Sequence, residues 1–530
     1  MCAALCVAAL WQSPAQAAIP GITGGGSAPV FNLVASAAYT TQPDGALIYT
    51  WGYGCGTGAS SGVATSAAPA GFAPAKLTAA NCPLMQIPGP TLIVHEGDAV
   101  VVHLSNALPI AAGSTSIVFS GLNVTSTGGV AGILTSEAAR GTNVTYSFNA
   151  AKPGTYTYHS GTRPDLQVEM GLYGVVIVLP KAVPACGSFD GSASAVHNGQ
   201  PDYRLAASAY DHAQTCYDRE YLFQMTEMDS NIHAAALAQV QACDAVQVAR
   251  PGSPCAPIVV KTEPYTPNYF LINGRSMPDD MDPSYAPQYP NQPYNGNPHL
   301  HPGETMLIRE VAHGRIQHPL HIHGNHARVL ARDGNLLLSA TDGRSLAGPL
   351  VFTFPTVSGQ AVDAIFQWTG KGLNWDVYAH NFPGAPGPTA AGVADPHPCF
   401  PDASGYYTAS SPLPAGAAAP VPGLTPNYGE WCADHNRPIP ITPPDPQIVA
   451  NGLWYGGTPY LGLQELPSGS PVFISTPLPP GAAQQNQSAG YAFMWHSHDE
   501  REITTNDVFP GGMMMMMIVD PPKATIDESL

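Results

Sequence analysis

Residues 91–104 read TLIVHEGDAVVVHL, two runs of β-branched and apolar residues separated by the polar turn sequence Glu96-Gly97-Asp98. Runs of this kind, bounded by glycine and polar residues, are typical of short β-strands joined by turns. Three similar runs follow, at 144–148 (VTYSF), 155–158 (TYTY) and 175–178 (VVIV). Several short strands at close spacing predict one Greek-key β-sandwich or barrel of ordinary domain size.

The composition also favours β structure with long loops. Gly 54 and Pro 55 make up 109 of the 530 residues, and charged residues account for only 11%, against about 25% in ordinary soluble proteins. Proline and glycine interrupt helices and suit turns, which excludes coiled coils and helical bundles. The formal charge, 19 − 37 = −18, leaves too few clustered cations for a nucleic-acid partner.

The chain is long enough for two or three domains. We expect a first β-domain over residues 28–181 and a second, C-terminal one over residues 299–522. Residues 182–298 between them form a mixed zone, interpreted as a reduced middle domain or linker, with a helix at 233–249 and a strand at 269–272.

A long insert at residues 376–471 interrupts the C-terminal domain and is rich in Pro, Gly and Ala. It contains Cys399 and Cys432, so we interpret it as an excursion held by a disulfide, which either covers a site or mediates assembly.

Residues 1–17 contain an apolar run followed by Ala15-Gln16-Ala17, a pattern that predicts a cleaved signal peptide; a short membrane anchor is the alternative. No later stretch reaches the roughly 20 apolar residues of a spanning helix, so we expect no membrane insertion of the mature chain. We therefore expect a secreted or periplasmic protein.

Eight cysteines follow the segment, an even number that suits an oxidising compartment. Nearest-neighbour pairing would give Cys55–Cys82, Cys186–Cys216, Cys243–Cys255 and Cys399–Cys432.

Histidine carries the chemical signal. His318-Pro-Leu-His321-Ile-His323 places three imidazoles in six positions, and His496-Ser497-His498 forms another doublet. Residues i and i+2 of a strand share a face, so each doublet can present two nitrogens to one metal ion, and copper suits imidazole ligands. A single strand histidine more often satisfies a core hydrogen bond. We interpret ten other histidines in that way, as core or surface residues: His95, His103, His197, His212, His233, His313, His326, His380, His397 and His435. His299-Leu-His301 is a further doublet, either part of a nearby site or a solvent-facing loop.

Several motifs together resemble those of the multicopper oxidases, the cupredoxin-fold family that includes laccases. The resemblance extends over most of the chain and is carried by Pro88-Gly-Pro-Thr91, Pro153-Gly-Thr-Tyr156 with His159-Ser160, Gly171-Leu-Tyr-Gly174, Ile272-Asn-Gly274, His318 to His323, and His496-Ser497-His498 with Gly511-Gly-Met513. It implies an all-β fold of tandem cupredoxin-like Greek-key β-sandwich or barrel domains with long Pro/Gly-rich loops, and copper as the cofactor.

The sequence departs from the family pattern at the copper ligands. The first motif reads Val118-Phe-Ser-Gly121 where the family has two histidines, and Gly161 replaces the second histidine of the second motif. Ser497 replaces the cysteine of the electron-transfer copper, and Glu502 stands where its second histidine is expected. A serine hydroxyl cannot make the copper–thiolate bond, so the resemblance implies that the blue type 1 site is lost.

When the family pattern is carried over residue by residue, five of the eight histidine ligands of its type 2 and type 3 copper sites remain. They are His321 from the type 2 site, and His159, His323, His496 and His498 from the type 3 positions. His318 remains from the electron-transfer site as a further candidate ligand. We expect one copper ion bound by three or four of the five imidazoles, with an open position for water or substrate.

Two other features stay open. Asp499 and Glu500 follow the last doublet and either relay protons to the site or form a solvated acidic turn. Met513 to Met517 could offer thioether sulfur to copper, although packing of a terminal strand is the favoured interpretation.

The sequence thus predicts an exported copper oxidoreductase in which substrate and oxidant meet at one histidine-ligated copper. Its partners would be a small-molecule or metal-ion reductant and dioxygen or peroxide, and an oligomer is possible. The alternative is a catalytically inactive copper-binding, structural or assembly protein derived from a multicopper oxidase.

Overall fold

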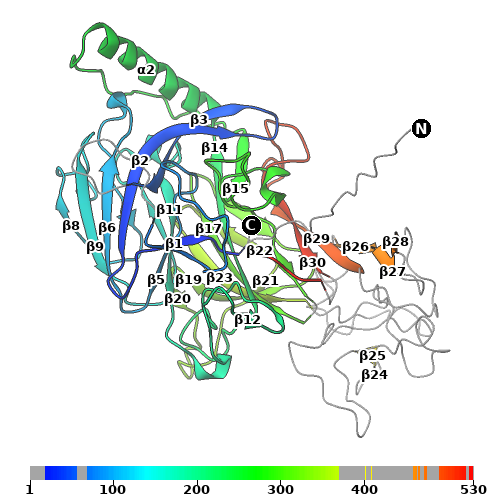
Figure 1. Cartoon of the computed structure of the whole chain (residues 1–530). Helices are drawn as coiled ribbons and strands as arrows, with labels where there is room; N and C mark the ends of the chain where they lie inside the picture. The colour runs from blue at the N-terminus through cyan, green and yellow to red at the C-terminus, as the bar shows by residue number, and fades with distance from the viewer. Residues whose placement is uncertain are drawn as a thin grey trace, which may run out of the picture.

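A computed structural model of the chain describes residues 18–56, 69–301, 303–368, 489–520 and 524–528, together with the backbone of five short strands between residues 400 and 473. The predicted signal segment, most of the insert at 376–471 and the pair Cys399 and Cys432 lie outside these residues. The described chain forms two β-sandwiches that pack side by side (Figure 1).

The first sandwich consists of two sheets that enclose a common apolar core. The outer sheet has the order β3 (Leu47–Cys55), β2 (Val30–Thr41), β6 (Ala99–Asn106), β9 (Asn143–Asn149) and β8 (Val124–Gly128). The inner sheet has the order β4 (Gly71–Ala73), β1 (Gly21–Thr23), β5 (Leu92–His95), β11 (Tyr173–Leu179), β10 (Gly154–His159) and β7 (Val118–Phe119).

The two sheets differ in burial for a physical reason. In β9 the side chains of Val144, Tyr146 and Phe148 are buried and alternate with more exposed residues, as expected for a strand with one face toward the core. In β11 every residue is buried. One face of β11 packs in the first core, and the other packs against side chains of the second sandwich, including Leu222 and Val311. The inner sheet therefore joins the two sandwiches.

The second sandwich also has two sheets. One runs β15 (Tyr269–Ile272), β14 (Arg219–Met228), β17 (Thr305–Ala312), β23 (Ala361–Gln367), β19 (Ala327–Arg332) and β20 (Asn335–Leu336), with β21 (Leu350–Val351) also paired to β19. The other runs β16 (His299–Leu300), β30 (Met514–Val519), β29 (Ala489–Ser497), β18 (His318–His321) and β22 (Thr353–Thr356), with β26 (Gly457–Leu461) also paired to β29.

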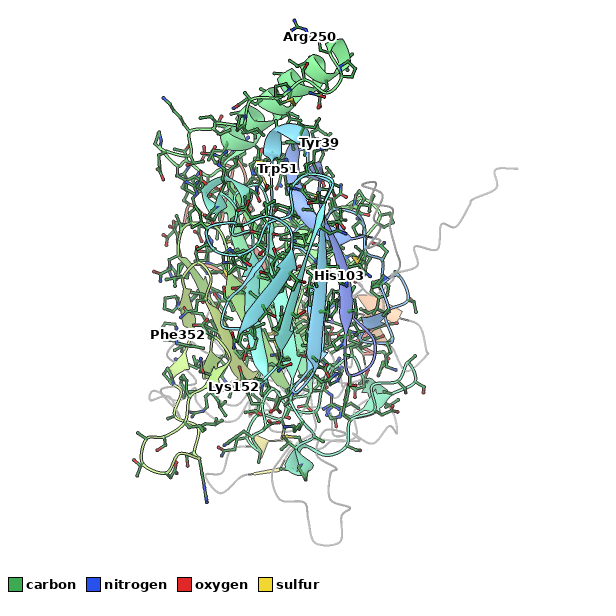
Figure 2. The ribbon with its side chains drawn as sticks, turned by 90° about the vertical axis from the view of Figure 1, so that its left-hand side faces the viewer. Tyr39, Trp51, His103, Lys152, Arg250 and Phe352 are labelled. Atoms are coloured by element: carbon green, nitrogen blue, oxygen red, sulfur yellow. A yellow bond between two sulfur atoms is a disulfide. The ribbon has the colours of Figure 1, made fainter. Side chains whose placement is uncertain are left out.

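The zone at residues 182–298 contributes to both sandwiches. Its strands β14 and β15 lie in the sheet of β17, so the boundary expected at residue 298 does not fall between sheets. Its helix α2 (Ser230–Ala249) packs instead on the first sandwich, through Ile232, Ala236 and Val240. The helix lies over β3 at one end of the molecule (Figure 1 and Figure 2). Its N-terminus is capped by Asp229, whose carboxylate accepts a hydrogen bond from the backbone N–H of Asn231.

The remaining elements are short. They are the helix α1 (Pro164–Gln167), the 3₁₀ turns η1 (Ile110–Ala112), η2 (Pro184–Cys186) and η3 (Asp279–Met281), and the strand pairs β12 (Val196–His197) with β13 (Gln200–Pro201), β24 (Phe400–Pro401) with β25 (Tyr407–Thr408), and β27 (Leu463–Glu465) with β28 (Pro471–Phe473).

The expectation of an all-β fold of tandem cupredoxin-like sandwiches is confirmed. The five strand runs quoted for the first domain lie in β5, β6, β9, β10 and β11. Three of the predicted disulfides are present, Cys55–Cys82, Cys186–Cys216 and Cys243–Cys255. In the part of the chain that the structure describes, no helix has the length and apolar character needed to cross a membrane.

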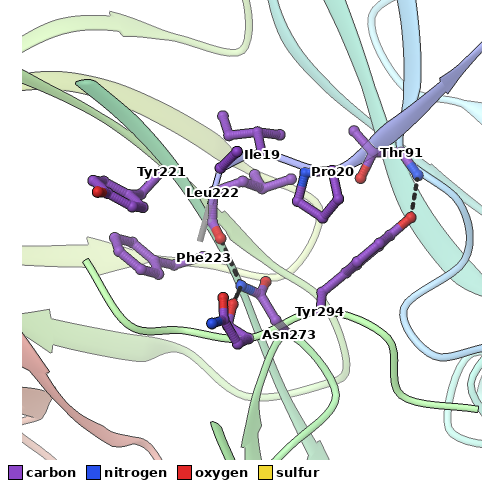
Figure 3. A pocket seen from close by; sticks show the side chains of 10 residues that line it. Ile19, Pro20, Thr91, Tyr221, Leu222, Phe223, Asn273 and Tyr294 are labelled. Carbon is purple, nitrogen blue, oxygen red and sulfur yellow. Dashed lines mark hydrogen bonds between the residues drawn. The ribbon is translucent and has the colours of Figure 1, made fainter. Parts of the chain in front are cut away.

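The first described residues are anchored in the body of the protein. Ile19 and Pro20 line a small pocket together with Leu222 and Phe223 of β14 (Figure 3). On its polar side, the backbone N–H of Thr91 donates to the hydroxyl of Tyr294 at 3.2 Å. The pocket is a packing contact between the N-terminal segment and the second sandwich, and none of the predicted metal ligands lines it.

Candidate metal centre

The two predicted histidine doublets come together because β18 and β29 are neighbours in one sheet. The strands are antiparallel, and their register places His321 opposite His496 and Leu320 opposite Ser497. Leu320 and Trp495 point into the core of the second sandwich and are fully buried. Side chains alternate along a strand, so this apolar face turns His321 and His496 toward the opposite face.

His321, His323 and His496 form a compact group. All three are buried, and one ligand nitrogen of each lies within 4.8 Å of those of the other two. The centroids of the His321 and His323 rings are 4.8 Å apart, and that of His496 lies 5.4 Å from His321 and 5.3 Å from His323. Three imidazole nitrogens that each bind one ion at about 2 Å must lie a few ångströms apart, so this group is close to the geometry of a three-histidine metal site.

Hydrogen bonds orient these rings. Nδ1–H of His496 donates to the carbonyl of Ser497 at 2.7 Å, and a 2.8 Å hydrogen bond joins Nδ1 of His321 to the hydroxyl of Thr353. Each bond leaves Nε2 as the ligand atom of its ring. The indole N–H of Trp495 donates to the carbonyl of His323 at 2.8 Å and so fixes the backbone at the third histidine. Such outer contacts are how proteins set the tautomer and direction of metal-binding histidines.

The electrostatics of the group keep its nitrogens available. Burial lowers the pKa of His321 to about 4, with further lowering from the neighbouring His323, His496 and His498. Burial also lowers the pKa of His496. The rings of both residues are therefore neutral at pH 7, which is the form that binds a metal ion.

The other two carried-over histidines are not part of this buried group of three. His498 lies at its solvent-facing edge, with its ring 4.9 Å from that of His321 and its side chain 49% exposed. Nδ1 of His498 lies 3.3 Å from a carboxylate oxygen of Glu500. His159 ends β10 in the first sandwich, where Nδ1–H donates to the carbonyl of Ser160 at 3.0 Å. Neither belongs to the described side chains whose ligand atoms all lie within 4.8 Å of one another.

The space of the missing first-domain ligands is filled. Val118 pairs directly with His159 across β7 and β10. A Cβ atom on Gly161 would lie 2.6 Å from a methyl carbon of Val118 and 3.2 Å from the hydroxyl of Ser116. A histidine at position 161 would therefore clash with this packing, which agrees with the reduced ligand set that the sequence predicts.

The sequence suggests His318 as a further metal ligand, but its ring is hydrogen-bonded to two carboxylates instead. Its Nε2 lies 2.9 Å from a carboxylate oxygen of Glu227, and its Nδ1 lies 2.9 Å from one of Glu502. Both ring nitrogens are thus used in hydrogen bonds on opposite edges of the ring, and neither is left for a metal ion. Ser497 completes this arrangement by donating its hydroxyl to the other oxygen of Glu502 at 2.5 Å.

The acidic residues after the last doublet are exposed. The backbone N–H of Asp499 donates to the hydroxyl of Ser497 at 3.2 Å, and the carboxylate of Asp499 caps the turn by accepting from the backbone of Arg501. Glu500 contacts His498 as described above. The turn thus supports the end of β29, and a proton-relay role for Asp499 and Glu500 stays a prediction.

The doublet at His299 and His301 has other partners. His299 is buried with Nδ1 2.7 Å from a carboxylate oxygen of Asp520, and Nε2 of His301 lies 2.8 Å from the carbonyl of Ala524. These bonds attach β16 to the C-terminal segment. Both residues are therefore structural in this arrangement.

Two functional neighbours were not predicted from the sequence. Thr353 orients His321 from β22, and nothing in its local sequence distinguishes it. Glu227 has a weak signal, because it is an acidic residue near the end of β14, whose residues are all buried. A buried carboxylate requires a partner, but the sequence does not show that the partner is His318.

Comparisons with known proteins agree with this picture. Residues 66–183 match the family model of the multicopper oxidases. Among curated proteins, a multicopper oxidase of Talaromyces pinophilus is 38% identical over 99 residues, which cover 18% of this chain and 16% of that protein. Laccase abr2 of Aspergillus fumigatus is 35% identical over 99 residues, with the same coverage. A copper-containing nitrite reductase of Neisseria meningitidis is 34% identical over 96 residues, or 18% of this chain and 24% of that protein.

A solved structure titled multicopper oxidase mgLAC covers 94% of this chain and 88% of its own, at 14% sequence identity and a TM-score of 0.44. Among the curated relatives, the matched segment spans only 16% of the two oxidases and 24% of the nitrite reductase. Two β-sandwiches, a three-histidine cluster and the sequence match at residues 66–183 are features of the cupredoxin class of proteins. The region at residues 66–183 is therefore similar to the multicopper oxidases.

Proposed function

We propose that this protein is a copper-dependent oxidoreductase that works at a single copper ion bound by His321, His323 and His496. The observation that carries the proposal is the convergence of three buried imidazoles whose ligand atoms lie within 4.8 Å of one another. Neutral imidazoles are ligands that copper prefers, and three of them leave a coordination position open for a substrate. When bound there, copper would supply one-electron chemistry by cycling between Cu(II) and Cu(I).

Other residues of the chain orient the ligand rings and form the exposed edge of the cluster. Thr353 and the carbonyl of Ser497 hold the rings of His321 and His496 in place. His498 and Glu500 stand at the exposed edge of the cluster, where a reductant would approach. His498 is a candidate fourth ligand, and Glu500 is within reach to orient its ring or accept a proton from it.

The absence of a cysteine at position 497 shapes the mechanism. Without a thiolate there is no blue copper centre to collect electrons at a distance. The reductant, which by class is a phenol, another small molecule or a metal ion, must therefore react next to the same cluster as dioxygen or peroxide. His159 of the first sandwich is proposed as a peripheral residue of this site.

Export belongs to the same proposal. The signal-like segment at residues 1–17 and three disulfides support a secreted or periplasmic location, because disulfides persist in oxidising compartments.

The direct test is the copper content per chain after loading with Cu(II) and desalting through a weak chelator. We expect about one copper for the wild type and none for the double variant His321→Ala with His323→Ala, with an unchanged circular dichroism spectrum. His95→Ala is the matched control, because that side chain is 68% exposed on the first sandwich. Undiminished copper in the double variant would refute the site.

An inactive copper-binding protein is the second candidate. It is favoured by Ser497 and Glu502, which stand where the family has the cysteine and histidine of the electron-transfer copper. It binds the same single copper but consumes no dioxygen. Oxygen uptake by the copper-loaded protein with a phenol, ascorbate or Fe(II) distinguishes the two functions. Uptake that is lost in the double variant supports an oxidoreductase, and copper retention without uptake supports the second candidate.

A further inference from the structure

A connected set of buried polar side chains lies on the reverse side of the two strands that carry the cluster. It consists of Glu227, His318, Ser497 and Glu502, joined by hydrogen bonds of 2.9, 2.9 and 2.5 Å. The residues are 2%, 0%, 0% and 0% exposed. Solvent therefore does not screen their charges, and each of their polar atoms needs a partner within the protein.

Glu502 bridges the two strands. One of its carboxylate oxygens contacts His318 at the start of β18, and the other accepts from Ser497 at the end of β29. Because Leu320 lies opposite Ser497 in this register, the bridge fastens β18 to β29 beside the position where His321 faces His496. The carboxylate thus holds the strand pair at the level of the metal ligands.

The geometry around His318 fixes its charge. A neutral imidazole has one N–H and one acceptor nitrogen, so it can donate to only one of two carboxylates on opposite edges of the ring. Both nitrogens of His318 lie 2.9 Å from a carboxylate oxygen. When both carboxylates at these positions are ionised, both nitrogens must carry hydrogen, and His318 is then an imidazolium.

Neighbouring charges agree with this assignment. Burial by itself lowers the pKa of His318, but the hydrogen bonds and charges of Glu227 and Glu502 outweigh burial and raise it to about 10. Glu310 of β17 adds a further buried carboxyl group near His318, and His313 is a neighbouring imidazole whose own pKa burial lowers to about 3. His313 is thus neutral at pH 7.

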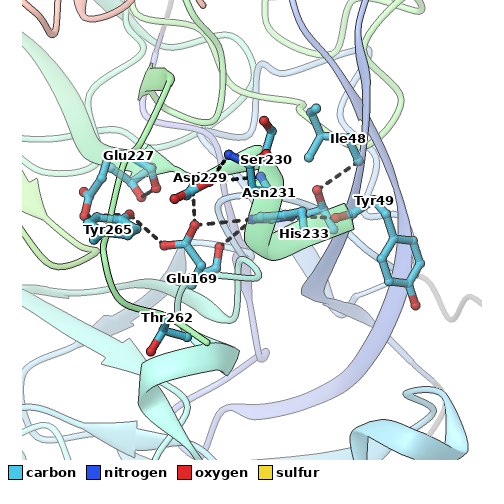
Figure 4. A network of polar contacts seen from close by, with 12 residues as sticks. Ile48, Tyr49, Glu169, Glu227, Asp229, Ser230, Asn231, His233, Thr262 and Tyr265 are labelled. Carbon is cyan, nitrogen blue, oxygen red and sulfur yellow. Dashed lines mark hydrogen bonds and ion pairs between the residues drawn. The ribbon is translucent and has the colours of Figure 1, made fainter. Parts of the chain in front are cut away.

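Residues that do not belong to this set hold the carboxylate of Glu227 in place (Figure 4). Its second oxygen accepts from the hydroxyl of Tyr265 at 3.2 Å and from the backbone N–H of Arg315 at 2.6 Å. The Tyr265 hydroxyl oxygen also lies 2.7 Å from a carboxyl oxygen of Glu169, and the guanidinium of Arg315 stacks over the Tyr265 ring at 4.7 Å. These contacts keep the carboxylate of Glu227 against His318.

We propose that the imidazolium of His318 replaces a metal ion at the former electron-transfer position. Glu502, which this imidazolium holds in place, joins β18 to β29 and so positions His321 and His496. His318, Glu502 and Ser497 are thus positioning residues, not ligands. The protonated network stands on the geometry above, whereas its effect on copper rests on the proposed function.

The first experiment uses the metal-free full chain labelled with ¹⁵N-histidine. The ring ¹⁵N shifts of His318, assigned with His318→Gln, are expected to be those of an imidazolium at pH 8, where an ordinary histidine is neutral. Glu502→Gln keeps the size of the side chain but removes one carboxylate, so the titration midpoint of His318 should move to lower pH. A neutral His318 at pH 8 in the wild type would overturn the proposal.

The second experiment measures copper affinity by competition with a chelator at pH 7. Glu502→Ala should weaken copper binding about 10- to 100-fold, in the range found when partners of metal ligands are removed, and Ser497→Ala should weaken it less. Glu304→Gln is the matched control, since it removes a buried carboxylate of the same sandwich that pairs with Arg219 instead. Equal losses of copper affinity in Glu502→Ala and Glu304→Gln would mean that the network contributes only to general stability, and the positioning role would be wrong.

The two experiments separate the failure of each proposal. If the wild-type chain binds no copper, the proposed function fails, while the ¹⁵N titration still decides whether His318 carries the extra proton. If copper binds tightly in Glu502→Ala and in the wild type alike, the metal site stands and the positioning role is wrong.

Discussion

His321 and His496 lie directly opposite each other in the antiparallel pair β18 and β29, with ring centroids 5.4 Å apart. They are separated by 175 positions of sequence, 496 − 321, and the register of one strand pair brings them together. A shift of one residue would turn either histidine to the other face. The residues that fix this register are therefore as important for the site as the ligands.

The buried and exposed members of the last doublet should contribute unequally. His496 is 9% exposed and belongs to the three-histidine group, whereas the side chain of His498 is 49% exposed at its edge. We expect His496→Ala to weaken copper binding by more than about 100-fold and His498→Ala by less than about tenfold, because removal of a ligand costs more than removal of a partner. Competition titration with a chelator measures both. Equal losses would mean that His498 is a full ligand.

Trp495 should affect the site through its hydrogen bond. Its indole N–H donates to the carbonyl of His323, and its ring packs against Phe223 and Phe366 in the core. Trp495→Phe keeps an aromatic ring there but leaves the carbonyl without its donor, which costs about 1–3 kcal/mol. We expect weaker copper binding together with a lower urea midpoint. Phe366→Leu, which disturbs the same core without this hydrogen bond, is the control and should lower the midpoint alone.

Local sequence patterns predicted much of the fold and the cluster. β-branched runs gave the strands of the first sandwich, and the alanine-rich stretch gave the helix that the structure has at Ser230–Ala249. Cysteine spacing gave three disulfides correctly, because each closes a short local loop. The doublets His321/His323 and His496/His498 were recognisable because period-two spacing is a local signal.

The partners of the cluster could not be predicted in this way. Glu227, His318 and Glu502 come from three distant segments, and their contacts depend on how the sheets pack. For the same reason, the sequence suggested His318 as a ligand, although two carboxylates occupy its nitrogens. β14 was assigned to a middle zone because its parallel pairing with β17 leaves no pattern in either strand.

Glu169 should make the stability of the protein depend on pH. Burial raises the pKa of its carboxyl group to about 8, even though the backbone N–H of Asp229 donates to it and the hydroxyl oxygen of Tyr265 lies 2.7 Å away (Figure 4). The folded state therefore holds this proton more tightly than the unfolded chain. The resulting stability is fully present below about pH 4.5 and is lost as pH rises through about 8.

The test is the urea midpoint of wild type and Glu169→Gln between pH 5 and pH 8.5. Glutamine stays neutral, and its amide can donate to the Tyr265 oxygen while that hydroxyl donates to Glu227. We expect the midpoint of the wild type to fall relative to that of the variant as pH rises. A constant difference across this range would show that Glu169 is ionised throughout.

If Ser497 and Glu502 stand at the family's electron-transfer position, as the resemblance implies, this position should bind copper after two substitutions but not after one. Nδ1 of His318 and the hydroxyl of Ser497 both point to the carboxylate of Glu502, at 2.9 and 2.5 Å. Blue copper sites need two imidazoles and a thiolate around one ion. Ser497→Cys supplies the thiolate but leaves Glu502 between the two ligands, so that variant should stay colourless on addition of Cu(II).

Ser497→Cys combined with Glu502→His supplies the missing imidazole at the same point. Glu227 still accepts from Nε2 of His318, which keeps the ring oriented with Nδ1 toward the new thiolate. We expect the double variant to turn intensely blue with Cu(II), measured by visible absorption, and Glu502→His alone to remain colourless as the control. A blue Ser497→Cys single variant would show that position 502 is not where the lost histidine stood, because the third ligand would then have to come from elsewhere.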